Sequence, residues 1–295
     1  MRDDTPSRTA AYVAAARGMG MLLPDAVRIA DDPYGIAFAS HRLAKLVERA
    51  PQSLATLPGV RAWILYMQVR TRILDDAART FVEQGGSQVV LLGAGYDCRA
   101  LRLPELDDAQ VFEVDHPATQ GHKRATLEKL GAASPARHVT WDYETRPMED
   151  LPEALAEAGH DPRAPTLTIW EGVTMYLTEP AIDASLRAIR DWSAAGSELA
   201  MTYFAKSRLT RPSFATRAIQ AVVARMGEPW RWGWVPEELP EFLEDRGWEL
   251  VDDIAMSDAA RALLPPHLAA GVSDPDRRIA LSSTPEKVAI STPHR

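Results

Sequence analysis

The chain has 295 residues, which suits one large domain with additions or about two domains. Hydrophobic residues make up 46% and charged residues 25%, a balance that excludes a disordered or fibrous protein. Asp and Glu outnumber Lys and Arg by 41 to 33, so no basic surface for nucleic acid or an anionic membrane is expected; the single cysteine excludes an intramolecular disulfide and a multi-cysteine metal site. We therefore expect a soluble, cytoplasmic protein, a monomer or homodimer, whose partner is a small molecule.

Residues 1–86 are predicted to form a helical N-terminal cap. Residues 10–23 are mostly small or apolar, but Arg17 interrupts them and the preceding charges balance, so we expect a helix capped by Ser7 rather than a signal peptide. A second short helix and then a long helix from about Val60 to Glu83 follow. The apolar stripe of the long helix comprises Trp63, Tyr66, Met67, Ile73, Leu74, Ala77 and Phe81.

Arg70 falls in the middle of this apolar stripe. An arginine there has two readings: a side chain that reaches solvent or forms a structural ion pair, or a guanidinium that binds a ligand carboxylate in two places. Arg72 is expected on the polar side of the helix with Asp75 and Asp76, as an ordinary surface pair.

Residues 87–295 show short β-rich runs alternating with helical patterns. The predicted strands are Gln88–Leu92, Val111–Asp115, His138–Asp142, Thr166–Glu171 and Glu198–Phe204, and the helices between them are Ala118–Leu130, Pro152–Ala158 and Glu179–Ser193. This alternation predicts an α/β fold with a doubly wound, mostly parallel sheet covered on both faces.

The C-terminal third departs from this alternation. We expect a lid insert at about 205–235, with a helix over Ser213–Met226 and an aromatic loop. A helix over Pro236–Arg246 and strands near Trp248–Ile254 and Lys287–Ser291 should follow. The last two strands are predicted to form an antiparallel pair that completes a seven-stranded sheet.

Chemistry is expected at the carboxyl ends of the strands, where open α/β sheets bind ligands. The first strand leads into Gly93 and Gly95, whose lack of a side chain permits a tight turn and close approach of a ligand. Asp115, Asp142 and Glu171 end three further strands, where a carboxylate needs a partner. A cationic ligand rich in hydroxyl and amino groups suits this set, and S-adenosyl-L-methionine has that chemistry.

Two other functions compete with this interpretation. An NAD(P)-dependent oxidoreductase uses a similar sheet, but Cys98 replaces the small residue of the dinucleotide pattern and a pyrophosphate would face several carboxylates. A catalytically inactive cofactor-binding partner is the other alternative. Isothermal titration with S-adenosylhomocysteine and with NAD(P) would separate the first alternative from a methyltransferase.

Several stretches resemble the leucine carboxyl methyltransferase family, and more closely its bacterial small-molecule O-methyltransferase branch. They occur in order along nearly the whole chain and are Asp31–Gly35, Val69–Arg72, Val89–Asp97, Phe112–Asp115, Trp170–Leu177 and Glu228–Arg231. The family usually has Thr where this chain has Cys98, and often Leu where it has Tyr143.

The resemblance implies a role for each matching residue. Arg70 would hold the methionine carboxylate of the cofactor, while Gly93 and Gly95 would pass beneath its methionine and ribose. Asp115 would accept from the ribose hydroxyls and Asp142 from the adenine amino group. By the same resemblance, Glu171 would help to hold the methionine end.

Substrate-orienting residues are harder to assign. Tyr176, Tyr203 and Arg231 are candidates, with Trp230, Trp232 and Trp234 lining an aromatic pocket or simply plugging the sheet. Arg208 and Arg211 flank the insert and are either lid residues or solvated surface charges.

Three further side chains have simpler readings beside the chemical ones. Cys98 is expected to be a packing residue rather than a reactive thiol, and His116 a loop histidine rather than a general base. No histidine pair has the spacing of a helical metal site, so no metal is expected.

These observations predict an S-adenosylmethionine-dependent O-methyltransferase. Because methyl transfer is an in-line displacement, the enzyme acts chiefly by alignment. A carboxylate acceptor is already ionised at neutral pH, whereas a hydroxyl acceptor needs a base or a lowered pKa. Since no positioned base is evident in the sequence, we expect a small-molecule carboxylate as the acceptor.

Overall fold

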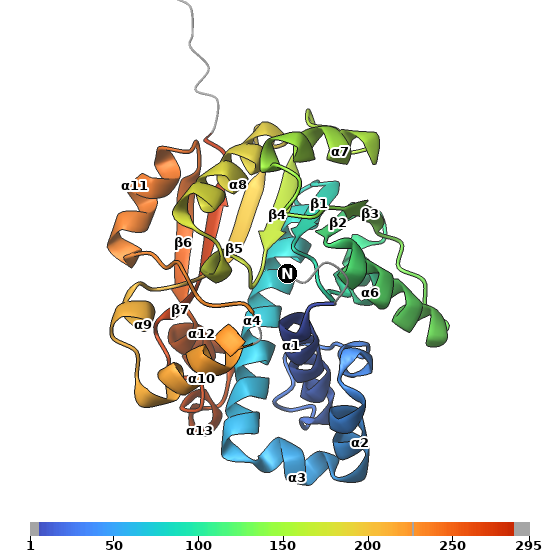
Figure 1. Ribbon diagram of the computed structural model, residues 1–295, viewed down its shortest axis with the longest axis vertical. Helices are drawn as coiled ribbons and strands as arrows, with labels where there is room; N and C mark the ends of the chain where they lie inside the picture. The colour runs from blue at the N-terminus through green and yellow to red at the C-terminus, as the bar shows by residue number, and fades with distance from the viewer. Residues whose placement is uncertain (1–5, 226, 286–295) are drawn as a thin grey trace, which may run out of the picture.

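A mixed sheet forms the centre of the computed structural model, which describes residues 6–225 and 227–285. The order of the strands is β3-β2-β1-β4-β5-β7-β6 (Figure 1). Their bounds are Gln88–Leu92 (β1), Gln110–Asp115 (β2), Arg137–Thr140 (β3), Thr166–Trp170 (β4), Glu198–Phe204 (β5), Glu249–Ala255 (β6) and Arg277–Ser283 (β7). Strands β1, β2, β3, β4 and β5 are parallel to one another, and β7 is antiparallel to both β5 and β6. The predicted α/β fold and its antiparallel C-terminal pair are confirmed.

The predicted strand bounds agree closely with the structure up to β6. β1 and β5 have the predicted ends, whereas β3 and β4 end earlier, so that Asp142 and Glu171 lie just beyond their strands. The last strand is Arg277–Ser283, while the predicted segment Lys287–Ser291 lies outside the described residues. The run Arg277–Ser283 was not predicted as a strand. It lies between β5 and β6 and pairs with both of them, so its hydrogen-bond partners come from segments that are remote in the sequence.

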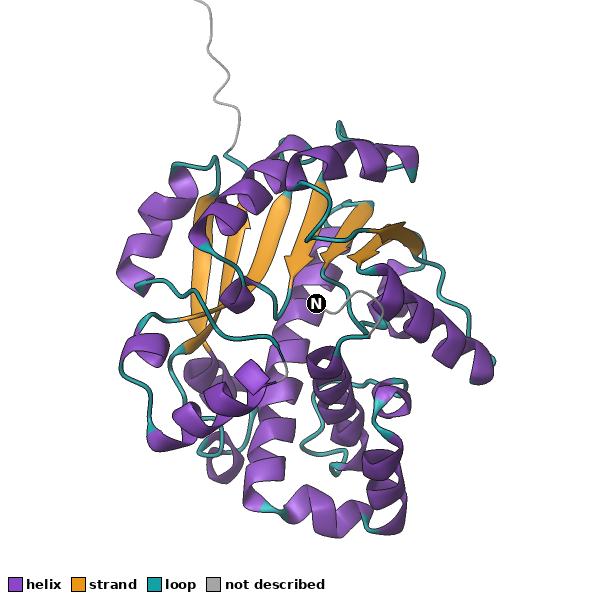
Figure 2. Cartoon of the chain, viewed as in Figure 1, coloured by secondary structure: helices purple, strands orange, loops and turns teal. Residues whose placement is uncertain are grey.

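Helices cover both faces of the sheet (Figure 2). The helices that follow β1 to β4 are Arg99–Arg102 (α5), Pro117–Lys129 (α6), Leu151–Glu157 (α7) and Glu179–Asp191 (α8), with short 3-10 turns at Pro104–Leu106, Met148–Asp150 and Thr174–Tyr176 (η3, η4 and η5). Alternate residues of β1 enter different cores. Val89 and Leu91 pack on the face of the long N-terminal helix, whereas Val90 and Leu92 pack on the face of α8.

The N-terminal part is helical, as predicted. It contains Arg8–Met19 (α1), His41–Arg49 (α2), Pro51–Thr56 (α3) and Pro58–Glu83 (α4), with 3-10 turns at Gly20–Leu22 and Gly35–Phe38 (η1 and η2). Ser7 caps α1 by accepting from the amide of Ala10 at 3.1 Å, as expected. Helix α4 runs from this cap along one face of the sheet, so a single helix joins the two parts of the chain (Figure 1).

The segments beyond β5 hold further helices. They are Ser207–Thr210 (α9), Phe214–Arg225 (α10), Pro236–Glu238 (η6), Leu239–Glu244 (α11), Met256–Leu263 (α12) and Pro266–Ala269 (α13). Helices α12 and α13 were not predicted from the sequence. Both are short, and their buried residues pack into the core beside α4, so tertiary contacts stabilise them.

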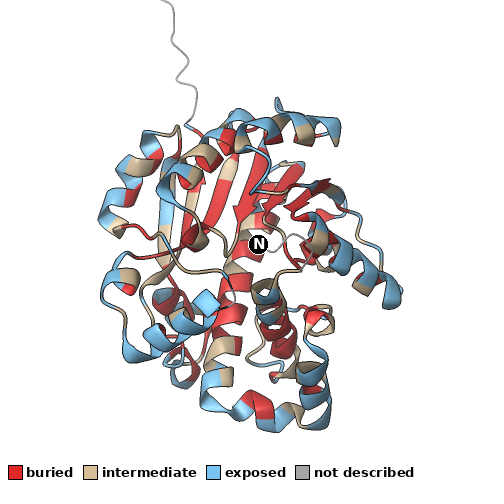
Figure 3. Ribbon diagram, in the orientation of Figure 1, coloured by how far each residue is buried: buried red, intermediate tan, exposed pale blue. Residues whose placement is uncertain are grey.

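Burial follows the layers (Figure 3). Strands β1, β2, β4 and β5 and the middle of α4 are largely buried, whereas the edge strands β3 and β6 and the outer faces of α2, α7 and α10 are largely exposed or half-buried. Within the described residues, no helix is both long and apolar enough to cross a membrane.

Candidate functional site

The turn after β1 places two glycines at the carboxyl edge of the sheet. Gly93 and Gly95 have φ values of +71° and +53°, in the region that favours glycine. A Cβ on Gly93 would lie 2.5 Å from Cγ2 of Val173, and one on Gly95 would lie 3.2 Å from Cβ of Ala10. The turn is therefore enclosed between α1 and the loop that follows β4.

Asp115 ends β2 beside this turn and is 8% exposed. Its Oδ2 accepts from the amide of Gly95 at 2.5 Å, and its Oδ1 accepts from the amide of His116 at 2.6 Å. Burial raises the pKa of Asp115 to about 6 despite these two hydrogen bonds. Because a carboxylate accepts up to about four hydrogen bonds, Asp115 keeps acceptor capacity for a ligand.

The next two polar side chains along this edge stabilise local structure. Nδ1 of His116 accepts from the amide of Ala118 at 3.2 Å, so the imidazole caps α6. This contact supports the loop-histidine reading over a general base. Asp142 accepts from the amide of Glu144 at 3.0 Å and from the hydroxyl of Thr145 at 2.8 Å, and so stabilises the turn after β3.

Arg70 and Glu171 lie together, although they come from α4 and from the residue after β4. Nη2 of Arg70 is 2.7 Å from Oε1 of Glu171, and Arg99 donates to Oε2 at 2.9 Å. Burial acts to raise the pKa of Glu171, but the two guanidinium groups outweigh it and hold that pKa well below its usual range. Arg70 is only 5% exposed, so its side chain does not reach solvent, and its Nε is buried with no hydrogen-bond partner among the described residues.

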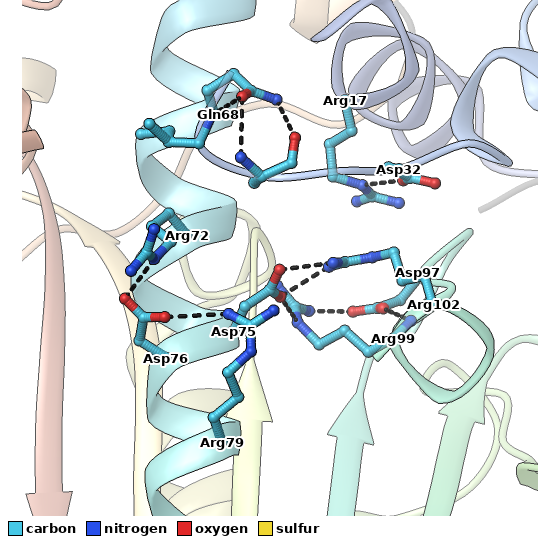
Figure 4. A network of polar contacts seen from close by, with 12 residues as sticks. Arg17, Asp32, Gln68, Arg72, Asp75, Asp76, Arg79, Asp97, Arg99 and Arg102 are labelled. Atoms are coloured by element: carbon cyan, nitrogen blue, oxygen red, sulfur yellow. Dashed lines mark hydrogen bonds and ion pairs between the residues drawn. The ribbon is translucent and has the colours of Figure 1, made fainter. Parts of the chain in front are cut away.

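A buried network of charges supports this pair (Figure 4). Arg99 is 1% exposed and donates to Asp75 at 2.8 Å and to the carboxylate of Asp97. Arg102 forms a bidentate pair with Asp75, at 2.6 and 2.7 Å. Each buried charge in the network therefore has an opposite partner, which offsets the cost of its desolvation.

The position of Asp75 corrects the sequence analysis. It was expected on the polar surface beside Arg72 and Asp76, but it is 1% exposed. Among the described residues, Arg72 pairs with Asp76 alone, at 2.6 Å. Asp75 precedes Asp76 in the helix but points toward Arg99 and Arg102, which belong to a segment remote in the sequence. Helical periodicity carries no information about that segment.

Helix α1 contributes a cation that the sequence analysis did not assign to the site. Arg17 is 6% exposed; its Nε bonds to Asp32 at 2.9 Å and its Nη2 donates to the carbonyl of Tyr96 at 2.6 Å. Burial lowers its pKa, but the attraction of Asp32, Asp97 and Glu171 outweighs burial and raises it. The signal in the sequence was Arg17, the single charged residue in the otherwise small or apolar stretch 10–23.

The two departures from the family pattern have local explanations. Cys98 is 1% exposed, and burial raises the pKa of its thiol to about 12, so it is a packing residue and not a reactive thiolate. The hydroxyl of Tyr143 lies 3.5 Å from the carbonyl of Val114, which places this side chain against the end of β2.

The structure separates the two candidate tyrosines. The hydroxyl of Tyr203 donates to Asp253 at 2.8 Å and accepts from Nε of Arg278 at 3.0 Å, so β6 and β7 engage it. Tyr176 ends η5, and burial together with the charge of Glu228 raises the pKa of its phenol to about 12. Both phenols therefore stay protonated at neutral pH, because burial also raises the pKa of Tyr203.

The aromatic loop packs against the rest of the fold. Trp230, Trp232 and Trp234 are all at least partly buried, and the rings of the last two are 6.0 Å apart, edge to face. The amide of Arg231 donates to the carbonyl of Met175 at 2.7 Å, while its side chain is exposed. The loop is thus fixed beside Tyr176, and pocket lining by one of its tryptophans remains a prediction.

The cations and carboxylates at this edge do not form a metal site. Among residues 6–225 and 227–285, no group of three or more His, Cys, Asp or Glu side chains is arranged to hold a metal ion. What the edge offers instead is a row of acceptors opposite buried guanidinium groups.

Solved structures with this fold include methyltransferases. A crystal structure from Thermobifida fusca, described as a "putative methyltransferase", aligns with a TM-score of 0.58 and 21% identity over 96% of both chains. A DUF574 family protein from Streptomyces avermitilis aligns with the same TM-score and 17% identity, over 92% of this chain and 97% of that one. These comparisons establish the fold.

Sequence comparison establishes the family. The model of the leucine carboxyl methyltransferase family matches residues 10–190. A Frankia alni protein named "Putative S-adenosyl-L-methionine-dependent methyltransferase" is 34% identical over 78% of each chain, and one from Mycobacterium sp. (strain JLS) is 34% identical over 82% of each. A Streptomyces coelicolor protein of the same description is 38% identical, and the match spans 61% of its length. The chain belongs to the leucine carboxyl methyltransferase family.

Proposed function

We propose that this protein is an O-methyltransferase that acts on a small-molecule carboxylate, with S-adenosyl-L-methionine as its methyl donor. Membership of the family and the description of its relatives give the class and the cofactor. The main support for the site assignment is the arrangement at the carboxyl edge of the sheet. Asp115 lies beside the glycine turn there, and the Arg70–Glu171 pair lies just beyond β4.

The polar atoms at this edge fit the cofactor. The buried Nε of Arg70 lacks an acceptor among the described residues, and the methionine carboxylate would supply one. Glu171 stays ionised and would face the methionine ammonium and sulfonium. Asp115 has acceptor capacity left for the ribose hydroxyls, and Asp142 would accept from the adenine amino group. Gly93 and Gly95 adopt the positive φ values that the turn beneath the methionine and ribose would need.

The proposed class of acceptor follows from the lack of an assigned general base among the candidate site residues. S-adenosylmethionine would supply a methyl group bound to a positively charged sulfur. The acceptor oxygen would bond to the methyl carbon while the carbon–sulfur bond breaks, leaving S-adenosylhomocysteine. His116 is used as a helix cap, and the phenols of Tyr176 and Tyr203 stay protonated. A carboxylate needs no base, so an acceptor of that class suits this edge, with Tyr176 and Arg231 as the orienting candidates.

The class of acceptor is tested with methyl-labelled S-adenosylmethionine and a panel of small organic acids and phenols. We expect label in a product that mild alkali releases as methanol, because methyl esters hydrolyse under conditions that methyl ethers survive. Alkali-stable label would contradict a carboxylate acceptor. Failure of the protein to bind S-adenosylhomocysteine would contradict the cofactor assignment itself.

Arg70 is tested by Arg70→Ala. The affinity for S-adenosylhomocysteine should fall by about 1.5–3 kcal/mol, the size of a charge-assisted bidentate contact, as measured by isothermal titration. Arg72→Ala is the matched control, since that guanidinium is half-exposed and its ion pair is with Asp76. Unchanged affinity in a folded Arg70→Ala variant would remove Arg70 from the site.

A further inference from the structure

Two guanidinium groups share one carboxylate beside the insert. Nη1 of Arg208 bonds to Oδ2 of Asp274, and Nε of Arg277 lies 3.5 Å from the same oxygen. Arg208 was expected to be a lid residue or a solvated charge, but it is 2% exposed, and its Nε has no hydrogen-bond partner among the described residues. The cluster thus has more buried donors than acceptors.

Aromatic rings surround these two arginines. Cζ of Arg208 lies 4.9 Å from the ring centroid of Phe204 and 5.1 Å from that of Trp230. Cζ of Arg277 lies 4.2 Å from the ring centroid of Tyr66. Rings that displace water lower the local dielectric, so an anion bound here would be attracted more strongly than at an open surface.

A cavity of about 410 Å³ opens against the cluster. Its charged lining is Arg208, Arg211, Arg277, Asp274 and Asp276, and its apolar wall comes from the start of α10 and the residues before it. Three guanidinium groups face two carboxylates, so the lining carries one excess positive charge. That excess suits a single carboxylate better than a doubly charged phosphate, and the apolar wall suits an organic body attached to it.

The cluster adjoins the proposed methionine end of the cofactor site. The ring of Tyr66 contacts both sides: its centroid is 5.7 Å from Cζ of Arg70 and 4.2 Å from Cζ of Arg277. Arg70 in turn pairs with Glu171. The ring of Tyr66 therefore separates the cluster from Arg70, so the two sites are neighbours.

We propose that Arg208 and Arg277 bind a carboxylate of the methyl acceptor, and that this carboxylate is not the group that becomes methylated. The inference rests on the proposed function. Two guanidinium groups stabilise an anion in the ground state, and esterification would remove the charge and those contacts, which slows rather than aids transfer. The acceptor then has an apolar body, an anchoring carboxylate and a separate reacting oxygen. Because the proposed function places that oxygen on a carboxylate, the acceptor would be a dicarboxylic acid.

The anchoring site is tested with 4-fluorobenzoate and its neutral counterpart 4-fluorobenzamide, observed by fluorine NMR at millimolar concentration. Saturating S-adenosylhomocysteine is present so that Arg70 is not available to the probe. We expect the wild type to bind the benzoate and not the amide. The variants Arg208→Gln and Arg277→Gln should each bind the benzoate about tenfold more weakly or worse. Equal binding of the two probes, or no binding of the benzoate, would overturn the proposal.

Two further variants separate binding from folding. Arg217→Gln, an exposed arginine of α10 outside the cavity lining, should leave benzoate affinity unchanged. Asp274→Asn removes the competing carboxylate and should tighten benzoate binding; weaker benzoate binding in a variant that keeps its affinity for S-adenosylhomocysteine overturns the proposal. Retained affinity for S-adenosylhomocysteine in every variant would show that the cofactor site is intact. If the wild type itself did not bind S-adenosylhomocysteine, the proposed function would be overturned instead.

Discussion

Two carboxyl groups at one edge of the sheet are driven in opposite directions by their neighbours. Burial raises the pKa of Asp115 to about 6, because two hydrogen bonds from backbone amides and the attraction of Lys123 do not offset it. Glu171 faces two guanidinium groups, and its pKa falls. Both sit at the end of a buried strand, so the difference comes from the side chains that other segments bring to them.

This difference gives a pH dependence to cofactor binding. In the proposed site, the ribose hydroxyls would donate to the carboxylate form of Asp115, so protonation would compete with binding as the pH falls through the folded-state pKa of about 6. The affinity for S-adenosylhomocysteine should be constant above pH 7 and weaken below pH 6, by up to about tenfold per pH unit. Isothermal titration across this range measures it.

Two variants identify the titrating group. In Asp115→Asn the affinity should be lower at neutral pH, and the decline toward acid should disappear. His116→Asn keeps a capping side chain but removes the neighbouring imidazole, so the decline should persist. If the decline vanished in His116→Asn and survived in Asp115→Asn, Asp115 would not be the titrating group.

At the scale of elements, α1 and η2 approach backbone to backbone. A Cβ on Gly35 would collide with the carbonyl oxygen of Ala14 and lie 2.7 Å from the amide nitrogen of Gly18. The same turn places the amide of Gly35 on Asp32, the partner of Arg17. The contact between α1 and η2 thus also holds the guanidinium that supports the glycine turn.

Gly35→Ala should therefore destabilise the protein by about 1–3 kcal/mol, because the colliding atoms belong to the backbone and cannot rotate away. It should also weaken binding of S-adenosylhomocysteine through displacement of Asp32 and Arg17. Thermal unfolding and isothermal titration measure the two effects.

The control lies on α6, where a Cβ on Gly121 meets no heavy atom within 4 Å. Gly121→Ala should stabilise the protein by about 0.5–1 kcal/mol through the helix propensity of alanine. If Gly35→Ala unfolded at the same temperature as the wild type, the close contact of α1 with η2 would not exist in solution.

At the scale of the molecule, the candidate site draws on both the cap and the sheet. Arg17 and Arg70 come from residues 1–86, whereas Asp115 and Glu171 come from the segments after β1. Helix α4 carries Arg70 and also packs into the core with β1 and β4. The cap and the methyltransferase core, which we treated as separate units of the sequence, should for this reason unfold together.

Differential scanning calorimetry tests this expectation. We expect one transition, and S-adenosylhomocysteine at a hundred times its dissociation constant should raise the free energy of unfolding by about 2.7 kcal/mol. A low-temperature transition that the ligand leaves in place would show that the cap unfolds independently and contributes nothing to binding.

The sequence by itself determined the sheet, its helical cover and the residues at the strand ends. Alternation of apolar runs with helical patterns reports local hydrogen bonding and burial, and these properties predicted β1, β5 and the ends of α4 closely. The positions of Gly93 and Asp115 followed from the same pattern, because a parallel sheet brings its carboxyl ends to one edge.

Only the tertiary structure decided which charges meet. Arg99 and Glu171 are 72 residues apart and share a hydrogen bond, and Asp75 is buried by arginines that its own helix does not contain. The place of β7 likewise depends on strands on both sides of it. Ion pairs and sheet edges depend on distances between remote segments, and neither residue type nor periodicity records those distances.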